Sequence, residues 1–237
     1  MDIKKIRFNA NLLPLQGLGV LLFFVLFFTS LHAVELDSKN RDPKYVETIV
    51  GRTKKIVDKL ELKDSAVYQN VLNIVANRYF KLNDIYSIRD SAVNRVKRSG
   101  ITGDEKTVAL NAAQNEKEAA LYRSHFAFPG DLSLYLNDTQ IEVIKDGITF
   151  GVVNVTYIAT LEMIPTLKEE EKVQILAWLK EGREFAIDAE TADKKHEAFG
   201  KFKGRINNYL AKRGYDLVKE REGWYARIKA KDEAQKK

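Results

Sequence analysis

The chain has 237 residues, no cysteine, three histidines and a formal net charge of +6. The lack of cysteine excludes disulfides and thiolate metal sites, and so few histidines argue against a histidine-rich metal centre. The basic excess is mild and spread along the chain, which argues against a nucleic-acid partner. We therefore expect no metal, no cofactor and no nucleic acid.

Residues 1–33 have the order of a secretory signal peptide. Basic residues come first, an apolar run follows from Leu18 to Phe28, and Leu31–Ala33 ends the segment with a small residue. The apolar run is well short of the roughly 20 residues that span a bilayer, so cleavage is favoured over a retained anchor. We predict export to the periplasm, the cell surface or the medium, and a mature chain of residues 34–237 without a membrane span.

After Pro43 the apolar residues recur at helical spacing almost throughout. We expect helices over about 46–60, 64–99, 104–125, 137–146, 166–189, 191–213 and from 216 onwards. Phe128-Pro129-Gly130 is expected to break the third helix, and the β-branched segment TFGVVNVT, residues 149–156, resists a helical interpretation. The predicted fold class is all-α: one bundle-like domain of about seven helices, with one irregular central segment and a frayed, basic C-terminal tail.

Side chains that cap helices support these boundaries. Asp64, Thr191 and Asp216 each precede a predicted helix and can accept a hydrogen bond from its first turn. Thr166 and Glu169 have the spacing of a capping box, which predicts a helix that begins between them.

The predicted helix over 191–213 contains two glycines that are four residues apart, Gly200 and Gly204. Each costs about 1 kcal/mol relative to alanine inside a helix. Either another helix packs closely on the glycine side, or a ligand approaches the backbone there.

A polar site is predicted on the same helix. Lys201, Arg205 and Asn208 share one face, and His196 and Arg183 are expected to be neighbours. Arginine, lysine and asparagine together supply the donors and acceptors that suit a ligand with hydroxyls and carboxylates.

Two alternatives stay open for this face. It can be a solvated charged surface, which is the usual meaning of such residues on a helix. Arg205 and Asn208 can instead be structural and tie the helix to the region of Tyr157 through buried hydrogen bonds.

Other residues suggest catalysis more weakly. Glu184 and Asp188 stand four apart, and paired carboxylates serve in glycoside hydrolysis, although Arg183 and Lys180 are near enough to neutralise them. His125 lies among aromatic residues before a predicted break, where it can be a general base at a pocket edge or a packing histidine.

The segment Phe199–Leu210, FGKFKGRINNYL, followed by GYDL, resembles a family of exported proteins common in Bacteroidetes that is catalogued as domain of unknown function family 3826. KDGITFGVV at 145–153 and GREFAID at 182–188 fit the same pattern. The resemblance implies carbohydrate utilisation at the cell envelope, since sugar binding is attributed to the family. Ala198 stands where a tryptophan is usual and Asn154 where a proline is usual; the missing aromatic weakens the sugar interpretation if that ring stacks on sugar.

The leading hypothesis is therefore an exported accessory protein of carbohydrate utilisation that binds a sugar or an acidic, uronate-containing glycan. A glycan-processing hydrolase or lyase is the first alternative. A helical periplasmic chaperone or stress protein is the second, because LNDTQ at 136–140 and the amphipathic helix after Thr166 resemble the repeats of small periplasmic chaperones.

Overall fold

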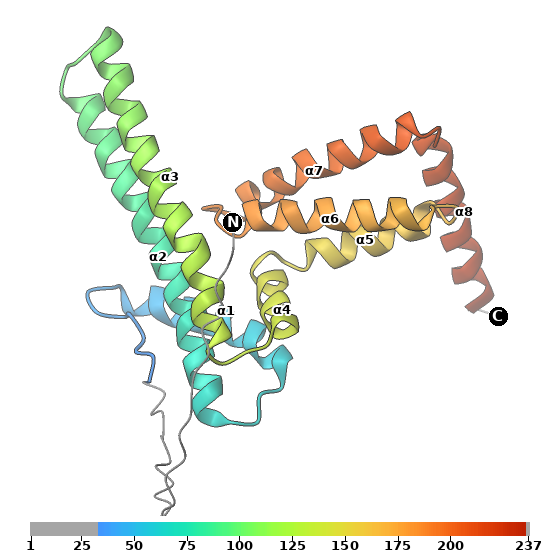
Figure 1. The fold of residues 1–237 in the computed structure, drawn as a ribbon, viewed down its shortest axis with the longest axis horizontal. Helices are drawn as coiled ribbons and strands as arrows, with labels where there is room; N and C mark the ends of the chain where they lie inside the picture. Colours follow the sequence, from blue (N-terminus) through green and yellow to red (C-terminus); the bar gives the residue numbers. More distant parts are fainter. Residues whose placement is uncertain (1–32, 236–237) are drawn as a thin grey trace, which may run out of the picture. The chain divides into compact units, whose positions relative to one another are not determined.

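The computed structural model describes residues 33–235, which fold into eight α-helices and a short 3-10 helix, with no strand in that range (Figure 1). The helices are α1 (Pro43–Val57), η1 (Asp58–Leu60), α2 (Ser65–Arg98), α3 (Gly103–Ser133), α4 (Asp138–Ile148), α5 (Val152–Met163), α6 (Glu169–Ala186), α7 (Ala192–Lys212) and α8 (Leu217–Gln235). The all-α prediction is confirmed. The predicted signal peptide lies outside the described residues, except for Ala33. None of the described helices combines the length and the apolar character that a bilayer crossing requires.

The three predicted N-terminal caps, Asp64, Thr191 and Asp216, are all present: the Asp216 carboxylate accepts hydrogen bonds from the backbone N–H groups of Val218 and Lys219, both at 3.1 Å, and α8 begins after it. The Asp64 carboxylate accepts hydrogen bonds from the backbone N–H groups of Ala66 and Val67, at 2.8 and 3.0 Å, and α2 begins after it. The Thr191 hydroxyl accepts from the backbone N–H of Lys194 at 3.2 Å and begins α7. In each of these helices the cap satisfies backbone donors that have no intrahelical partner.

The predicted capping box of Thr166 and Glu169 is wrong. The cap of α6 is Lys168, whose backbone N–H donates to Glu171 Oε2 at 2.9 Å. Glu171 is buried, and its carboxylate also accepts a hydrogen bond of 2.7 Å from the Tyr215 hydroxyl. A tertiary contact with a distant tyrosine therefore decides which acidic residue closes the first turn.

The segment 149–156 is not the irregular stretch that its composition predicts. The Thr149 hydroxyl donates to the carbonyl four residues earlier at 2.8 Å, and a turn follows in which Phe150 and Gly151 have φ of 62° and 67°. From Val152 onwards the chain is helical, which adds α5 to the seven predicted helices. Packing of α5 against α6 outweighs the strand preference of its β-branched residues.

The third helix also runs further than predicted. Pro129 lies inside α3, which ends at Ser133. A proline inside a helix costs about 3 kcal/mol. Phe128 and Leu132 flank it and are both buried in a hydrophobic cluster, and this burial offsets the cost.

The apolar side chains form two principal clusters, one for each half of the helical sequence. The first cluster is built mainly by α1, α2, α4 and the end of α3, and includes Val57, Val71, Val75, Leu132, Ile144 and Ile148. The second is built by α5, α6 and α7, with α8 packed against it, and includes Val153, Ile175, Leu179, Phe199, Ile206 and Leu210. Ile187, just after α6, belongs to the first cluster. The link from α6 to α7 is thereby anchored beside the α2–α3 hairpin (Figure 1).

Candidate functional site

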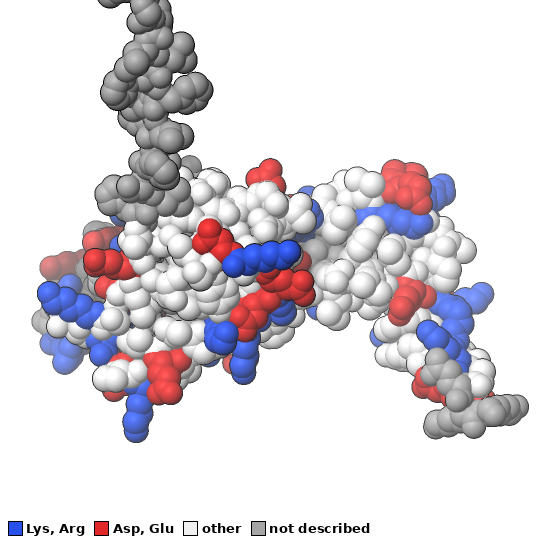
Figure 2. Space-filling view, turned by 90° about the horizontal axis from the view of Figure 1, so that it is seen from below, with Lys and Arg blue, Asp and Glu red and all other residues white. Residues whose placement is uncertain are grey.

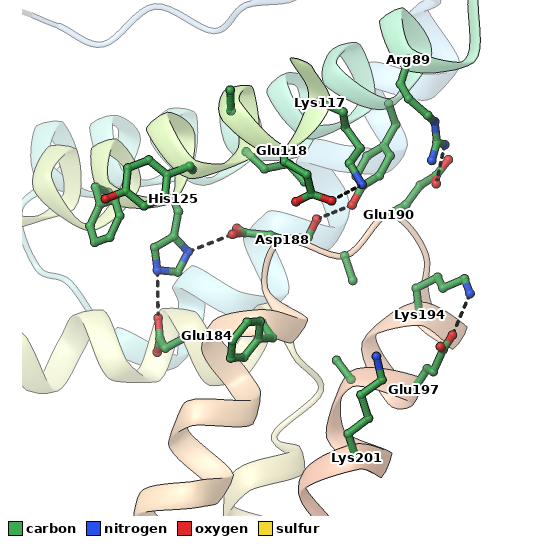
Figure 3. Close-up of a pocket in the computed structure, with 18 residues that line it drawn as sticks. Arg89, Lys117, Glu118, His125, Glu184, Asp188, Glu190, Lys194, Glu197 and Lys201 are labelled. Carbon is green, nitrogen blue, oxygen red and sulfur yellow. Dashed lines mark hydrogen bonds and ion pairs between the residues drawn. The ribbon is translucent and has the colours of Figure 1, made fainter. Parts of the chain in front are cut away.

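A cleft of about 890 Å³ lies between the α2–α3 hairpin and the junction of α6 with α7 (Figure 3). Its walls combine aromatic rings with charges of both signs. Its charged and histidine lining residues are Arg89, Lys117, Glu118, His125, Glu184, Asp188, Glu190, Lys194, Glu197 and Lys201. The volume is in the range of pockets that take a small-molecule ligand.

His125 of α3 is held between two carboxylates that belong to the other wall (Figure 3). Its Nδ1 lies 2.9 Å from Asp188 Oδ2, and its Nε2 lies 3.8 Å from Glu184 Oε2. A carboxylate facing Nδ1 places a proton on that nitrogen. Nε2 is then the ring nitrogen that faces Glu184 and the cleft.

Asp188 is fixed by a buried arginine and a partly buried tyrosine, both of α2. Its carboxylate pairs with Arg78 of α2, which is only 4% exposed and also donates to the Ser124 hydroxyl. The Tyr86 hydroxyl donates to the Asp188 carbonyl at 2.9 Å, and burial raises the pKa of Tyr86 to about 12. These contacts preorganise the carboxylate that orients His125.

Glu184 is anchored from the opposite side by cations. Lys145 Nζ lies 2.9 Å from Glu184 Oε2, and Arg183 Nη2 lies 3.1 Å from Glu184 Oε1. Arg183 is 2% exposed and also pairs with Glu142 at 2.6 Å and Asp146 at 2.8 Å. Burial opposes ionisation of Glu142, but hydrogen bonds from Arg183 and a second cation lower its pKa overall. This ionic cluster joins α4 to α6 beneath the cleft.

Exposed aromatic side chains surround the histidine. Tyr122 and Phe126 of α3 are 68% and 60% exposed, and Phe185 of α6 is 64% exposed. The Phe126 ring stands edge-on to His125 with centroids 5.1 Å apart, and Phe185 stacks on Phe202 at 5.8 Å. Three exposed aromatic rings close to one polar group form the kind of apolar patch that marks ligand-binding or interaction sites.

A buried lysine supports the same junction from inside. Lys195 is 6% exposed, and its ammonium donates to the backbone carbonyls of Ala186 and Ile187 at 3.1 and 3.3 Å. It therefore satisfies carbonyl groups at the C-terminal end of α6, where a cation is favoured. Burial lowers the pKa of Lys195 to about 8.

The structure separates the residues of the predicted polar site. Lys201 lines the cleft, while His196 is exposed and stacks on the Phe150 ring at 5.6 Å. Arg205 is exposed; it pairs with Glu181 at 3.2 Å and lies 4.5 Å over the Trp178 ring. Asn208 is exposed and forms no side-chain hydrogen bond within residues 33–235.

Arg183 does not join that group. It is buried in the ionic cluster with Glu142 and Asp146 and is not among the residues that line the cleft. The alternative in which Arg205 and Asn208 make buried hydrogen bonds near Tyr157 is wrong, because both side chains are exposed.

The two glycines of α7 do not serve close helix packing. A Cβ at Gly200 or Gly204 would meet nothing within 4 Å. The packing explanation of these glycines is therefore wrong, and the backbone of this face is open. The close approach occurs at Gly182 of α6 instead, where a Cβ would lie 2.9 Å from Phe202 Cδ2.

Sequence reasoning paired Glu184 with Asp188 but considered His125 apart from them. His125 and Asp188 are 63 residues apart, and Arg78 is 110 residues from Asp188. The aromatic residues around His125 were the available signal for a pocket edge. No signal in the sequence indicated the buried roles of Arg78 and Lys195, because arginine and lysine are ordinarily surface residues.

Charges of both signs are mixed on the part of the surface that Figure 2 shows, without a large field of one sign. Such a surface is unlike the basic stripe that binds nucleic acid. Within residues 33–235, no group of histidine and acidic side chains has the arrangement of a metal site.

Comparison with known proteins gives a family and no named relative. No curated protein matches the sequence. The profile of one family, described as a protein of unknown function, DUF3826, matches residues 46–230, which include every helix from α2 to α7 and the whole lining of the cleft. The chain belongs to this family, DUF3826.

Proposed function

We propose that the protein is an exported accessory protein of carbohydrate utilisation and that it binds a sugar in the cleft around His125. The observation that carries the proposal is the placing of exposed rings beside oriented polar groups. Tyr122, Phe126 and Phe185 are uncovered, while the Asp188 and Glu184 carboxylates are held by cations behind them. Sugar rings present apolar C–H faces and hydroxyl edges, and this combination complements both.

The carboxylates have the chemistry that sugar hydroxyls need. Asp188 and Glu184 are acceptors, His125 offers a ring nitrogen, and each is fixed before a ligand arrives. Preorganised acceptors lose little conformational freedom on binding. Hydrogen bonds between hydroxyl groups and charged partners contribute about 1.5–3 kcal/mol each.

An acidic sugar is the form of ligand that Lys201 favours. Three other cations of the cleft are already paired: Arg89 with Glu190, Lys117 with Glu118, and Lys194 with Glu197. Lys201 lines the cleft and forms no ion pair within the described residues. Glu197, one turn earlier on α7, interacts with Lys201 only through space, so a uronate carboxylate would supply Lys201 with a direct ionic partner.

The proposed location outside the cytoplasm rests on residues 1–33. Their basic, apolar and small-residue order is that of a cleaved export signal. An extracytoplasmic place also suits a sugar-binding accessory protein, which would meet glycan fragments before they are imported.

Calorimetric titration of the mature chain against neutral and uronate-containing oligosaccharides tests the proposal. Phe185→Ala and Tyr122→Ala should each weaken binding at least about fivefold, as truncation of a contact residue does. Tyr225→Ala is the matched control, because Tyr225 is 57% exposed on α8, away from the cleft lining. Equal affinity in all three variants, or no binding of any glycan, would refute the site.

The His125–Asp188 pair favours a second candidate function, glycan processing. A histidine whose Nδ1–H is held by a carboxylate has Nε2 free to take a proton from a substrate or a water molecule. Both the hydrolase and the lyase hypotheses require a side chain that transfers a proton, and His125 is one candidate for that role. Chromatography of the glycans after incubation separates the two candidates: wild-type protein that releases products which His125→Gln does not release is an enzyme, and intact bound glycan indicates a binding protein.

A further inference from the structure

The backbone of residues 34–37 lies along α2 and forms hydrogen bonds with asparagine side chains of that helix. The Val34 N–H donates to Asn70 Oδ1 at 2.8 Å, and Asn73 Nδ2 donates to the Val34 carbonyl at 2.6 Å. Asn70 and Asn73 are 7% and 8% exposed. Because buried amides need partners, these two side chains depend on the Val34 backbone.

A third asparagine of α2 continues the pattern one turn further along. Asn77 Nδ2 donates to the Glu35 carbonyl at 2.8 Å, and Asn77 Oδ1 accepts from the Asp37 N–H at 2.8 Å. Residues 70, 73 and 77 are spaced three and four apart, so they lie on one face of the helix. We call Asn70, Asn73 and Asn77 the asparagine ladder.

Apolar contacts fix the same segment. Val34 packs against the first hydrophobic cluster, and Leu36 packs against a smaller one that contains Phe80. The segment is closed by Arg41, which pairs with Asp84 at 2.8 Å. Ala33, in contrast, is exposed.

We propose that the asparagine ladder is the binding site for the new amino terminus that forms when the chain is cleaved after Ala33, with the side-chain oxygen Oδ1 of Asn70 accepting a hydrogen bond from the Val34 ammonium. A peptidase of the export machinery would hydrolyse the Ala33–Val34 amide. One water is consumed, a carboxylate remains on Ala33 and an ammonium forms on Val34.

Cleavage strengthens the hydrogen bond from the Val34 nitrogen to Asn70 Oδ1, which already exists in the uncleaved chain. The nitrogen of Val34 is a neutral amide donor before cleavage and a charged donor afterwards, and charge-assisted hydrogen bonds are shorter and stronger. Cleavage therefore tightens the fixed segment onto α2 instead of leaving a free end. This inference rests on the predicted cleavage and does not depend on sugar binding, so failure of one leaves the other standing.

Resistance to an aminopeptidase tests the binding site directly. A chain produced to start at Val34 should be trimmed at least about tenfold more slowly than its Asn70→Ala/Asn73→Ala variant, because trimming requires local release of the segment. Asn83→Ala is the matched control, an exposed asparagine of the same helix. Intact mass spectrometry follows the reaction. Equal trimming rates in the folded wild-type and double-variant chains would overturn the proposal.

A charge substitution keeps the test decisive if the double variant does not fold. Asn70→Asp puts a buried carboxylate at the ladder, which is tolerated only opposite a positive charge. The Asn70→Asp variant should be compared in two chains, one that starts at Val34 and one extended by residues 29–33. The melting temperature of the chain that starts at Val34 should be higher by about 3–6 °C. The melting temperatures of the same two chains without the substitution should differ by less. No difference between the two forms of Asn70→Asp, or an exported protein that does not start at Val34, would contradict the inference.

Discussion

Gly182 of α6 lies directly beneath Phe202 of α7: a Cβ at position 182 would come within 2.9 Å of Phe202 Cδ2 and 3.3 Å of Phe202 Cβ. The contact brings the two helices together beside Phe185, which stacks on the same ring at 5.8 Å. A glycine of α6 therefore helps to set the position of an aromatic side chain of the cleft.

Gly182→Ala should destabilise the protein by about 1–3 kcal/mol, because the added methyl group forces Phe202 or the helix backbone to move. Gly200→Ala is the contrasting substitution. It meets nothing within 4 Å and removes the glycine cost, so it should stabilise by up to about 1 kcal/mol. Chemical denaturation of both variants measures the difference. If the two substitutions have the same sign, the proposed packing of α6 on α7 is incorrect.

Arg183→Ala should cost about 1–3 kcal/mol, since it removes the buried cation that Glu142, Asp146 and Glu184 share, while a lysine remains paired with Glu142 and another with Glu184. Arg205→Ala should cost less than about 1 kcal/mol, because Arg205 and its partner Glu181 are both about half exposed. Thermal unfolding of the two variants under one buffer condition makes the comparison. An Arg183→Ala protein as stable as Arg205→Ala would show that the ionic cluster contributes little.

Lys201→Ala should weaken binding of a uronate-containing ligand about tenfold and leave binding of a neutral sugar nearly unchanged, since only the first presents a carboxylate to the ammonium. Lys203→Ala removes the same charge from the same helix at a position that does not line the cleft. Titration of both ligands into both variants distinguishes a local contact from a general charge effect. Equal losses with Lys203→Ala would place the acidic ligand elsewhere.

Stability should rise with pH through the ionisation of Lys195. Burial lowers its pKa from 10.5 to about 8, so between these values the unfolded chain binds the proton and the folded chain does not. Unfolding free energy increases with pH wherever the unfolded state holds more protons. The cost of burying the ammonium is therefore fully present below pH 8 and is relieved towards pH 10.5.

The measurement compares wild type with Lys195→Met, in which this titration is absent. The stability of wild type relative to the variant should increase by about 3 kcal/mol across that window. The subtraction removes titrations that both proteins share. A difference that is flat with pH would mean that Lys195 keeps its ordinary affinity for protons when folded.

Local signals in the sequence predicted most of the helices correctly. The caps at Asp64 and Thr191 act within one turn, so their effect is visible without knowledge of the fold. The helix over Val152–Met163 was missed because its β-branched residues favour a strand, and only contacts with α6 and α8 reverse that preference. Pro129 was expected to break its helix, and here too a tertiary contact, the burial of Phe128 and Leu132, reverses the local preference.

The candidate site was less accessible to prediction. The face of Lys201, Arg205 and Asn208 follows from helical geometry alone, and all three are exposed as such a face requires. The meeting of His125 with Asp188 depends on how α3 lies against the α6–α7 junction, which no local pattern specifies. The pairing of Arg183 with Glu184, which the sequence suggested, is present, but the grouping of Arg183 with the polar face of α7 was wrong because Glu142 and Asp146 of α4 hold it elsewhere.

The two principal hydrophobic clusters imply that the two halves of the helical sequence can open to solvent independently of each other. Amide hydrogens of the α5–α8 half should exchange with solvent through openings that leave α1 and α2 protected, since each half holds its own apolar contacts. The ties across the junction are largely polar, with Ile187 as an apolar exception. A ligand that touches both His125 and Lys201 would join the two halves into one cooperative unit, and its binding would be recorded as slower exchange far from the cleft.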